Sequence, residues 1–353
     1  MALTTVRPEG MGFNTGRRNL IINGAMQVAQ RGTSASLVHD GTISDISPDR
    51  FPIQLNNTLD ELEGTLAQVT DSPDGFSNSL KWTTTEPEVA IDADHYVSIW
   101  QKIEAQNLQH IKNGSSGALS LTLSFYVKSS QTGTFGVNIY KPDNTGRVIN
   151  ATYAISSADT WEYKTITFPG DTSGGGIDNN TGIGLYCVWH LAAGSNFDSV
   201  NSTSWANYST TNWAGGHAQD GVITTDNATW QITGVQLEVG ENASDFEHRS
   251  FGEELALCQR YFQFEPFSVT GWPQSATRFS AGFMYVQSMR ANPSITLHSG
   301  FYGYGPGGQQ SISSIATYSI GDSSAVMHFD TPGGMTVNTG CVAQPVMKLD
   351  SEL

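Results

Sequence analysis

The stretch TWQITGVQLEVGENASDFEHRSFGEELALCQRYF, residues 229 to 262, decides the fold. Its first part predicts a buried strand in which Trp230 and Ile232 alternate toward one face. At Gly234 the alternation slips, and the apolar residues up to Val239 continue on the opposite parity. A slip of this kind at a glycine is typical of a β-bulge, which turns the second half of a strand.

A capped helix follows that strand after the acidic turn Gly240 to Asp245. Ser250 and, three residues later, Glu253 form a capping-box signature, which marks the start of a helix. Apolar residues then recur at helical spacing at Phe251, Leu255, Cys258 and Phe262. We therefore predict a β domain that ends near Val239 and residues 249–263 as a connecting helix.

Composition favours an all-β protein. The chain has 353 residues, enough for two domains, and only 14% of them are charged, whereas glycine alone contributes 37. This mixture suits short strands joined by polar turns and is poor in helix formers. The 17 basic and 33 acidic residues give a net charge of −16, which repels nucleic acid and anionic membranes.

Cysteine usage and the N-terminal residues indicate an intracellular origin. Cys187, Cys258 and Cys341 lack the spacing of a disulfide framework or a zinc site. Residues 1–15 lack the basic start and apolar core of a secretion signal, and no apolar run approaches the roughly 18 residues of a membrane span. We predict assembly in a reducing cytoplasm and no membrane insertion.

Residues 1–48 are predicted to form an N-terminal arm. Asn19 to Met26 is a short apolar run that ends in a turn, and as a single strand it needs a partner elsewhere. It is either an edge strand of the next domain or an arm for attachment or assembly with another protein.

Residues 49–248 are predicted to form an antiparallel jelly-roll β-sandwich. Leu119 to Val127 alternates apolar and polar residues, and Phe135 to Ile139 repeats the pattern after a turn, which predicts a hairpin. With four further candidates and the closing strand this makes roughly eight strands, as expected of a two-sheet jelly roll.

One connection in this region is unusually long. Leu191 to Thr225 is rich in Ser, Asn and Gly, and it carries several aromatic residues. Such long connections are uncommon unless they are functional or disordered. Its aromatics either stack on a sugar or pin the segment to the sandwich. The candidate receptor-binding residues are Trp205, Asn207, Tyr208, Trp213, His217 and Asp220.

Residues 264–353 are predicted to form a small C-terminal β domain of about five or six strands. The glycine-rich segment Phe301 to Gly308 separates two of its strands and carries a second aromatic patch, Phe301, Tyr302 and Tyr304, with the same two interpretations.

Catalytic motifs are missing from the sequence. It contains no HExxH, GxSxG, P-loop or GxGxxG pattern, so we predict no catalytic residues and no enzyme activity. A glycosidase carboxylate pair has no fixed spacing and stays open. Asp92, Asp94 and His95 form the tightest polar cluster, which is either a calcium site or, more simply, a solvated turn. We predict no other cofactor or metal.

Several short segments resemble, in order, the landmarks of tail-fibre and related virion proteins of tailed bacteriophages, many of them from marine and cyanobacterial phages. These segments are NLIINGAMQ (19–27), QRG (30–32), DRF (49–51), QKIE (101–104), LSFYVK (123–128), ITGVQLEVG (232–240), FE (246–247), LALCQRY (255–261) and MRANP (289–293).

The resemblance implies a jelly roll similar to carbohydrate-binding modules, a C-terminal β domain, a homotrimer and a place on the virion. It supplies no catalytic residues. The functional hypothesis is a trimeric tail fibre that contacts a glycan or protein of the host surface. The alternatives are a capsid fibre or decoration protein and, from another class, a polysaccharide depolymerase.

Trimerisation gives the connecting helix a second interpretation. Leu255, Cys258 and Phe262 either form a contact around a three-fold axis or pack under the sandwich.

Overall fold

The computed structural model describes residues 18–39, 43–44, 48–56, 58–299, 301–305, 308–333, 335 and 340–352. The chain forms two compact units. The first holds Pro52–His248 with Ser36–Ser44 and the chain up to Met26. The second holds Arg249–Leu353 with the short segments Gln27–Ala35 and Asp45–Phe51. Residues of the predicted arm therefore contribute to both units.

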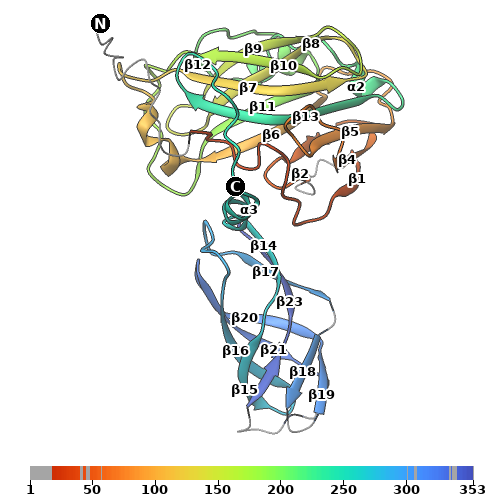
Figure 1. The fold of residues 1–353 in the computed structure, drawn as a ribbon, viewed down its shortest axis with the longest axis vertical. Helices are drawn as coiled ribbons and strands as arrows, with labels where there is room; N and C mark the ends of the chain where they lie inside the picture. Colours follow the sequence, from red (N-terminus) through yellow and green to blue (C-terminus); the bar gives the residue numbers. More distant parts are fainter. Residues whose placement is uncertain are drawn as a thin grey trace, which may run out of the picture. The chain divides into compact units, whose positions relative to one another are not determined.

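The first unit contains two antiparallel sheets, whose strands can be followed in Figure 1. A six-stranded sheet has the order β1-β4-β5-β13-β7-β10 and a seven-stranded sheet the order β12-β9-β8-β11-β6-β3-β2. The strands of the first sheet are β1 (Ser34–Val38), β4 (Glu63–Val69), β5 (Ser79–Glu86), β13 (Thr229–Val239), β7 (Leu121–Ser129) and β10 (Glu162–Phe168). Those of the second are β12 (Ala206–Asn207), β9 (Arg147–Ile155), β8 (Gly133–Lys141), β11 (Ile183–Ala193), β6 (Tyr96–Glu104), β3 (Ile53–Leu55) and β2 (Ile43–Ser44).

The inner faces of these sheets meet in an aromatic core. Phe125 of β7 packs against Tyr153 of β9 and Trp189 of β11, with ring centroids 5.1 and 5.9 Å apart. Trp230 of β13 donates a hydrogen bond from its indole N–H to the Tyr153 hydroxyl at 3.3 Å. Burial raises the pKa of Tyr153, and the hydrogen bond from Trp230 lowers it. The effect of burial is the larger of the two. The all-β, antiparallel sandwich predicted from the sequence is confirmed.

Strand β13 confirms the predicted glycine bulge. Its pairing with β7 shifts register between Thr233 and Gln236, and Gly234 has φ +62. This φ lies in the left-handed region, which glycine adopts without steric cost. The bulge lies in the interior of the sheet, because β13 pairs with β5 on one side and with β7 on the other.

The predicted hairpin of residues 119–139 is wrong. Strand β7 pairs with β13 and β10, whereas β8 pairs with β11 and β9, so the turn carries the chain from one sheet to the other. Phe125 and Phe135 both bury their rings in the core. Alternation reports which face of a strand is buried, and it cannot tell a pair in one sheet from two strands facing across a sandwich.

The predicted strand of residues 19–26 is also wrong. These residues form irregular turns with Ile21 and Met26 fully buried, and Asn23 and Met26 have positive φ. The segment still bonds to β13: the Leu20 N–H donates to the Leu237 carbonyl and the Val235 N–H donates to the Gly24 carbonyl, both at 2.9 Å. The Asn19 amide donates to the Val235 carbonyl at 3.0 Å, and its oxygen accepts from the Leu237 N–H at 3.1 Å. A few backbone bonds and one side chain thus take the place of a regular ladder.

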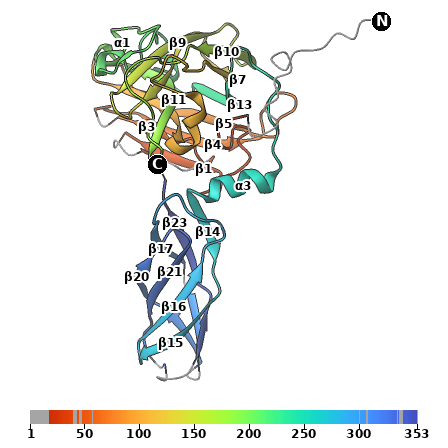
Figure 2. The same cartoon turned by 90° about the vertical axis from the view of Figure 1, so that its left-hand side faces the viewer.

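The second unit starts with helix α3 (Phe251–Gln259), which leads into β14 (Figure 2). The capping box is confirmed, since the Ser250 hydroxyl accepts from the Glu253 N–H and the Glu253 carboxylate accepts from the Ser250 N–H. The helix ends before Phe262, which begins β14. A three-stranded sheet has the order β14-β23-β17 and a seven-stranded sheet the order β19-β18-β22-β15-β16-β21-β20.

These strands are β14 (Phe262–Pro266), β15 (Val269–Ser275), β16 (Arg278–Met284), β17 (Ser294–Ser299), β18 (Phe301–Gly305), β19 (Gly308–Ile312), β20 (Ser314–Ile320), β21 (Ser324–Asp330), β22 (Cys341–Ala343) and β23 (Val346–Asp350). The glycine-rich segment predicted to separate strands contains a strand itself, β18. Among the described residues, no helix has both the length and the apolar character needed to cross a membrane.

Candidate functional site

A groove of about 580 Å³ lies on the outer face of the six-stranded sheet. Its floor comes from outward-facing residues of adjacent strands, with Tyr126 and Ser124 of β7 opposite Tyr163 and Thr165 of β10. Loop residues form its sides. The remaining lining residues are Asp74, Gly75, Phe76, Gly234, Asn242, Ala243, Ser244, Asp245, Phe246 and His248. The volume is in the range of about 300–1,000 Å³ that is usual for ligand sites.

The bulge at Gly234 makes room for this groove. A Cβ at this position would lie 2.7 Å from Cζ of Phe76 and 3.1 Å from Cδ2 of Tyr126. These distances are shorter than van der Waals contacts, so a side chain at residue 234 would push the Phe76 ring away. The glycine that shifts the strand register therefore also lets an aromatic ring lie directly on the sheet.

Aromatic rings form a continuous row along the groove. Tyr163 lies beside Tyr126 with centroids 4.9 Å apart, and Tyr126 lies 5.6 Å from Phe76. Phe76 in turn contacts Phe246 and His248, at 5.0 and 5.3 Å. Tyr163 retains 48% of its surface exposed. A row of rings with an open end is a surface on which flat apolar ligand faces can stack.

Hydrogen bonds hold the wall formed by residues 242–248 in place. The Ser244 N–H and hydroxyl donate to the two oxygens of Glu238, at 2.8 and 2.6 Å. The Glu247 N–H donates to the side-chain oxygen of Gln236 at 2.8 Å. Gln236 and Glu238 belong to the half of β13 that follows the bulge and are buried. The wall is therefore anchored to the sheet that forms the floor.

Polar groups of the groove are left without protein partners. The carboxylates of Asp74 and Asp245 make no hydrogen bond or ion pair with any residue that the structure describes. Ser124 is only 3% exposed, and within the same described residues its hydroxyl also lacks a hydrogen bond. The Ser124 hydroxyl oxygen is not itself fully buried, so it can bind water or a ligand in the groove.

The sequence-predicted residue Trp213 lies elsewhere, on the outer face of the seven-stranded sheet. It is 8% exposed and packs edge-on against Tyr140, Tyr208 and Trp100, at centroid distances of 5.6, 5.8 and 6.4 Å. The Asn138 side chain donates to its carbonyl. The long connection thus covers its own sheet, and a sugar would reach this indole only after the segment moved.

His217 and Asp220 also serve this covered region. His217 is buried, and its Nδ1 accepts from the Gly136 N–H at 3.0 Å. Its Nε2 lies 3.4 Å from Asp220, whose carboxylate accepts from the Ala193 N–H at 3.1 Å. Beneath them, burial lowers the pKa of His190 well below its usual value, and the neighbouring His217 lowers it further.

The other predicted residues of this connection are partly engaged. The Trp205 indole donates to the Pro169 carbonyl at 2.6 Å, and the Asn207 side-chain oxygen accepts from Arg147 at 3.0 Å. Tyr208 keeps 38% of its surface exposed, the largest open aromatic of the set. The predicted residues therefore gather on one face, and receptor binding there stays a prediction.

The groove residues were not found from the sequence. Tyr126 fits the polar half of the alternation of residues 119–127, Tyr163 lies within a predicted strand, and Phe76, Phe246 and His248 lie in short loops. One signal was present: a tyrosine at the outward position of each of two strands is unusual where Ser, Thr and Lys otherwise alternate. What the sequence could not supply is the pairing of β7 with β10, which places the two tyrosines side by side.

The two remaining groups of predicted site residues lie in the second unit. Cys258 and Phe262 are buried inside the second unit, where the Arg31 guanidinium lies 3.8 Å from the Phe262 ring centroid, while Leu255 is half-buried. A contact between copies through these residues stays a prediction that rests on Leu255. The backbone of Phe301, Tyr302 and Tyr304 forms β18, and their side chains lie outside the described residues.

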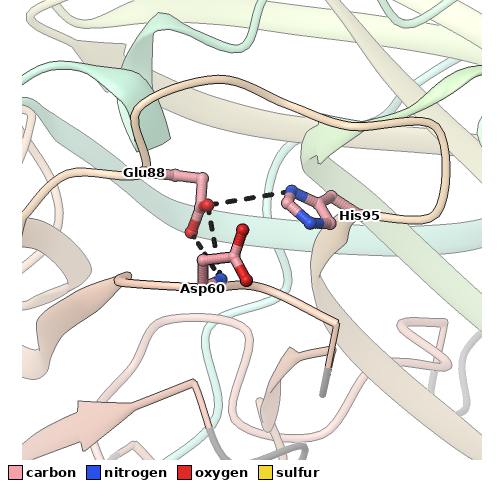
Figure 3. A group of neighbouring side chains, drawn as sticks. All are labelled: Asp60, Glu88 and His95. Atoms are coloured by element: carbon pink, nitrogen blue, oxygen red, sulfur yellow. Dashed lines mark hydrogen bonds and ion pairs between the residues drawn. The ribbon is translucent and has the colours of Figure 1, made fainter.

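One group of side chains has the composition of a metal site (Figure 3). Ligand atoms of Asp60, Glu88 and His95 lie within 4.8 Å of one another. Glu88, however, is 2% exposed, and its oxygens accept the backbone N–H groups of residues 60, 61 and 62 at 3.2–3.3 Å. The His95 Nδ1 accepts from the Asp92 N–H at 3.2 Å and lies 3.9 Å from Glu88.

This geometry fits a hydrogen-bonded clamp better than an ion site. The lone pairs that a metal would need already accept backbone N–H groups, which pin residues 60–62 beside Glu88. Of the predicted polar cluster Asp92, Asp94 and His95, only His95 joins this group, and neither of the carboxylates proposed as calcium ligands does. Asp94 contributes its backbone carbonyl, which accepts from Asn56 and Thr58 at 2.8 and 2.7 Å.

Comparisons with known proteins give no family. No family model matches the chain, and no curated protein matches it. Among solved structures, the chain is similar to the enzymatically active domain of tailspike protein 4 from bacteriophage CBA120, with 12% identity and a TM-score of 0.33 over 63% of this chain and 21% of that one. The aligned part is therefore about a fifth of the tailspike chain.

Two further structures are similar along their whole length. A putative sugar binding protein from Bacteroides thetaiotaomicron has 12% identity and a TM-score of 0.34, covering 63% of this chain and 100% of that one. The family 11 carbohydrate-binding module from Clostridium thermocellum has 11% identity and a TM-score of 0.29, covering 61% and 98%. At these TM-scores the likenesses do not identify a function.

Proposed function

We propose that this protein is a virion structural protein of a tailed bacteriophage, a homotrimeric tail fibre whose first unit binds a glycan of the host cell surface in the groove. The observation that carries the glycan part is the open row of aromatic rings beside unpaired polar groups. The virion part is supported by the ordered segments that resemble phage fibre proteins, from residue 19 to residue 293.

The chemistry of the groove matches that of a sugar ring. A pyranose has an apolar C–H face, which packs on an aromatic ring, and a rim of hydroxyls, which need hydrogen-bond partners. Tyr163 offers an exposed ring, and Asp74, Asp245 and Ser124 offer side-chain oxygens without a partner in the part of the chain that the structure describes. A fixed wall and floor keep these groups in place before the ligand arrives, which lowers the entropic cost of binding.

The test is a binding titration with host surface polysaccharide and an oligosaccharide panel, using matched tyrosine variants. Tyr163→Ala removes a 48% exposed ring of the groove, and Tyr208→Ala removes a 38% exposed ring of the opposite sheet. We expect Tyr163→Ala to weaken binding about tenfold or more, or ~1.4 kcal/mol, and Tyr208→Ala to leave it unchanged. The reverse result would move the receptor site to the long connection and overturn the groove assignment.

A polysaccharide depolymerase is the rival, since Asp74 and Asp245 are two carboxylates in one groove. We propose binding without hydrolysis and expect no new reducing ends when the titrated mixtures are incubated. Release of reducing ends that is lost in Asp74→Asn or Asp245→Asn would make the protein a glycosidase.

Location separates the tail fibre from a capsid fibre or decoration protein. Reconstruction of the virion with symmetry imposed and then relaxed is expected to find copies in threes around the tail. Copies on the icosahedral shell would refute the tail position. For the trimer itself, Leu255→Asp is expected to shift the mass measured by light scattering from three chains to one, and an intact trimer would exclude the contact through α3.

A further inference from the structure

The groove has an unbalanced charge. Asp74 and Asp245 contribute two carboxylates, and no Lys or Arg is among the lining residues that the structure describes. Two cations on this side of the sheet make other contacts: Arg18 donates to the Asp245 backbone carbonyl at 2.9 Å, and Lys128 pairs with Asp71 and lies 5.2 Å from the Trp161 ring. The net charge of −16 adds a repulsive field of the same sign.

This excess of negative charge should favour cationic over anionic saccharides. A uronate, sulfate or phosphate group in the groove would face two carboxylates, and no Lys or Arg among the described lining residues could pair with it. A protonated amine would instead gain two acceptors that no described residue occupies. Carboxylates left unpaired in the free protein also lose no existing bond when such a ligand arrives.

Ser124 gives independent support for a ligand with its own polar rim. It is 3% exposed, lies on the groove floor, and its hydroxyl has no hydrogen-bond partner among the described residues. Its strand neighbours Leu123 and Phe125 point into the core, so the hydroxyl faces the groove between the rings and the wall. A sugar hydroxyl stacked beside Tyr126 would satisfy it.

We propose that the groove is selective for saccharides with a free, protonated amino group, such as N-deacetylated hexosamine polymers, and that it excludes anionic saccharides. The proposal rests on the proposed glycan binding and specifies its ligand class. Asp74 and Asp245 are the specificity-determining residues, Ser124 and the tyrosines bind the ring, and the side chain of neither aspartate is needed to hold the wall.

The experiment compares three oligosaccharides of equal length by calorimetric titration: glucosamine, N-acetylglucosamine and galacturonate oligomers. The wild-type chain is expected to prefer the amine over the N-acetyl form at least about threefold at low salt and not to bind the uronate. Because the screening length falls from about 30 Å at 0.01 M to about 3 Å at 1 M salt, the preference should shrink toward unity as salt is added.

Substitutions of the two aspartates test whether they cause the preference for the amine. Asp74→Asn with Asp245→Asn should abolish the amine preference while N-acetylglucosamine oligomers still bind. Asp159→Asn, an exposed carboxylate outside the groove lining, makes the same kind of charge change and should alter nothing.

Two failures are distinguishable. If uncharged or anionic oligomers bind as tightly as the amine, and Tyr163→Ala still removes that binding, the charge selectivity is wrong and glycan binding stands. If none of the three oligomers nor the host polysaccharide binds, the proposed function fails and the selectivity with it.

Discussion

The outer faces of the two sheets in the first unit both carry a cluster of aromatic rings, but only one is left open. On the seven-stranded sheet, Trp213 from the long connection fills the space over Tyr140 and Trp100. On the six-stranded sheet, the wall that includes Phe246 is tied down beside the rings and leaves a groove. Aromatic residues in a loop therefore mark a binding site only where the loop does not cover them itself.

The polar groups differ in solvent access rather than in hydrogen-bond saturation. Over the seven-stranded sheet His190 lies 3.1 Å from both Ser98 Oγ and Asn138 Nδ2, but Asn138 Oδ1 is buried without a hydrogen-bond partner among the described residues. In the groove the Asp74 carboxylate also lacks a described partner, but Asp74 is exposed. Only the groove therefore offers polar groups that a ligand can reach without a rearrangement.

The largest expected effect is a loss of folding stability, caused by a substitution on the outer face of the seven-stranded sheet. Trp213→Ala removes an indole that is 8% exposed and should lower the free energy of unfolding by about 3–5 kcal/mol, measured by urea denaturation. Saccharide binding in the groove should persist under conditions where the variant is folded. A stability close to wild type would mean that this indole is not a packing residue, and the contrast between the faces would disappear.

The second expected effect tests whether the bulge at Gly234 makes room for the Phe76 ring. Gly234→Ala places a Cβ 2.7 Å from the Phe76 ring at φ +62, so it should cost about 1–3 kcal/mol of stability and weaken saccharide binding. Gly240→Ala is the matched control, because Gly240 also has positive φ (135) but nothing within 4 Å of its Cβ position. If both variants bind saccharide equally well, Phe76 does not depend on the bulge.

The third expected effect is a pH dependence of folding stability that arises from His190. Because the folded-state pKa of His190 is lowered, only the unfolded chain gains a proton as the pH falls below about 6.5. Stability is therefore complete above that pH and falls by about 1.4 kcal/mol per pH unit below it, down to the folded pKa. Urea denaturation at pH 7.5 and 5.5 measures the loss, and His190→Gln should reduce it; an unchanged slope would assign it to other groups.

The smallest expected effect concerns carboxylates that are already satisfied. Glu88 accepts several backbone N–H groups, so we expect chelator to leave the unfolding temperature unchanged, whereas Glu88→Gln should lower it because its amide opposes those donors. A drop in chelator that added calcium reverses would instead establish a metal at Asp60, Glu88 and His95.

The features that depend only on residues close together in the chain could be predicted from the sequence. The bulge at Gly234, the capping box at Ser250 and the alternating faces of β7 and β8 are all local patterns, and each lies where it was predicted. It failed where the outcome depends on which strand pairs with which. The same alternation is compatible with a hairpin and with a crossover between sheets, and only the second occurs.

The candidate site shows the same limit. Trp213 was singled out because a tryptophan in a long polar connection is conspicuous, yet its burial depends on Tyr140 and Trp100, which lie in two other strands. Tyr126 and Tyr163 come together only through the β7–β10 register. Proximity between distant segments is a property of the folded sheet and leaves no trace in local periodicity.

The way the second unit uses residues 27–35 has a consequence for the time at which this protein can finish folding. Arg31 lies 3.3 Å from Asp350 and 3.2 Å from Glu352, partners that are 319 and 321 residues away in the chain. At translation rates of about 5–20 residues per second, Arg31 waits roughly a quarter of a minute to one minute for them. Phe262, whose ring Arg31 covers, is synthesised only late in that interval, so chaperone demand should be highest between the synthesis of Phe262 and that of these acidic residues.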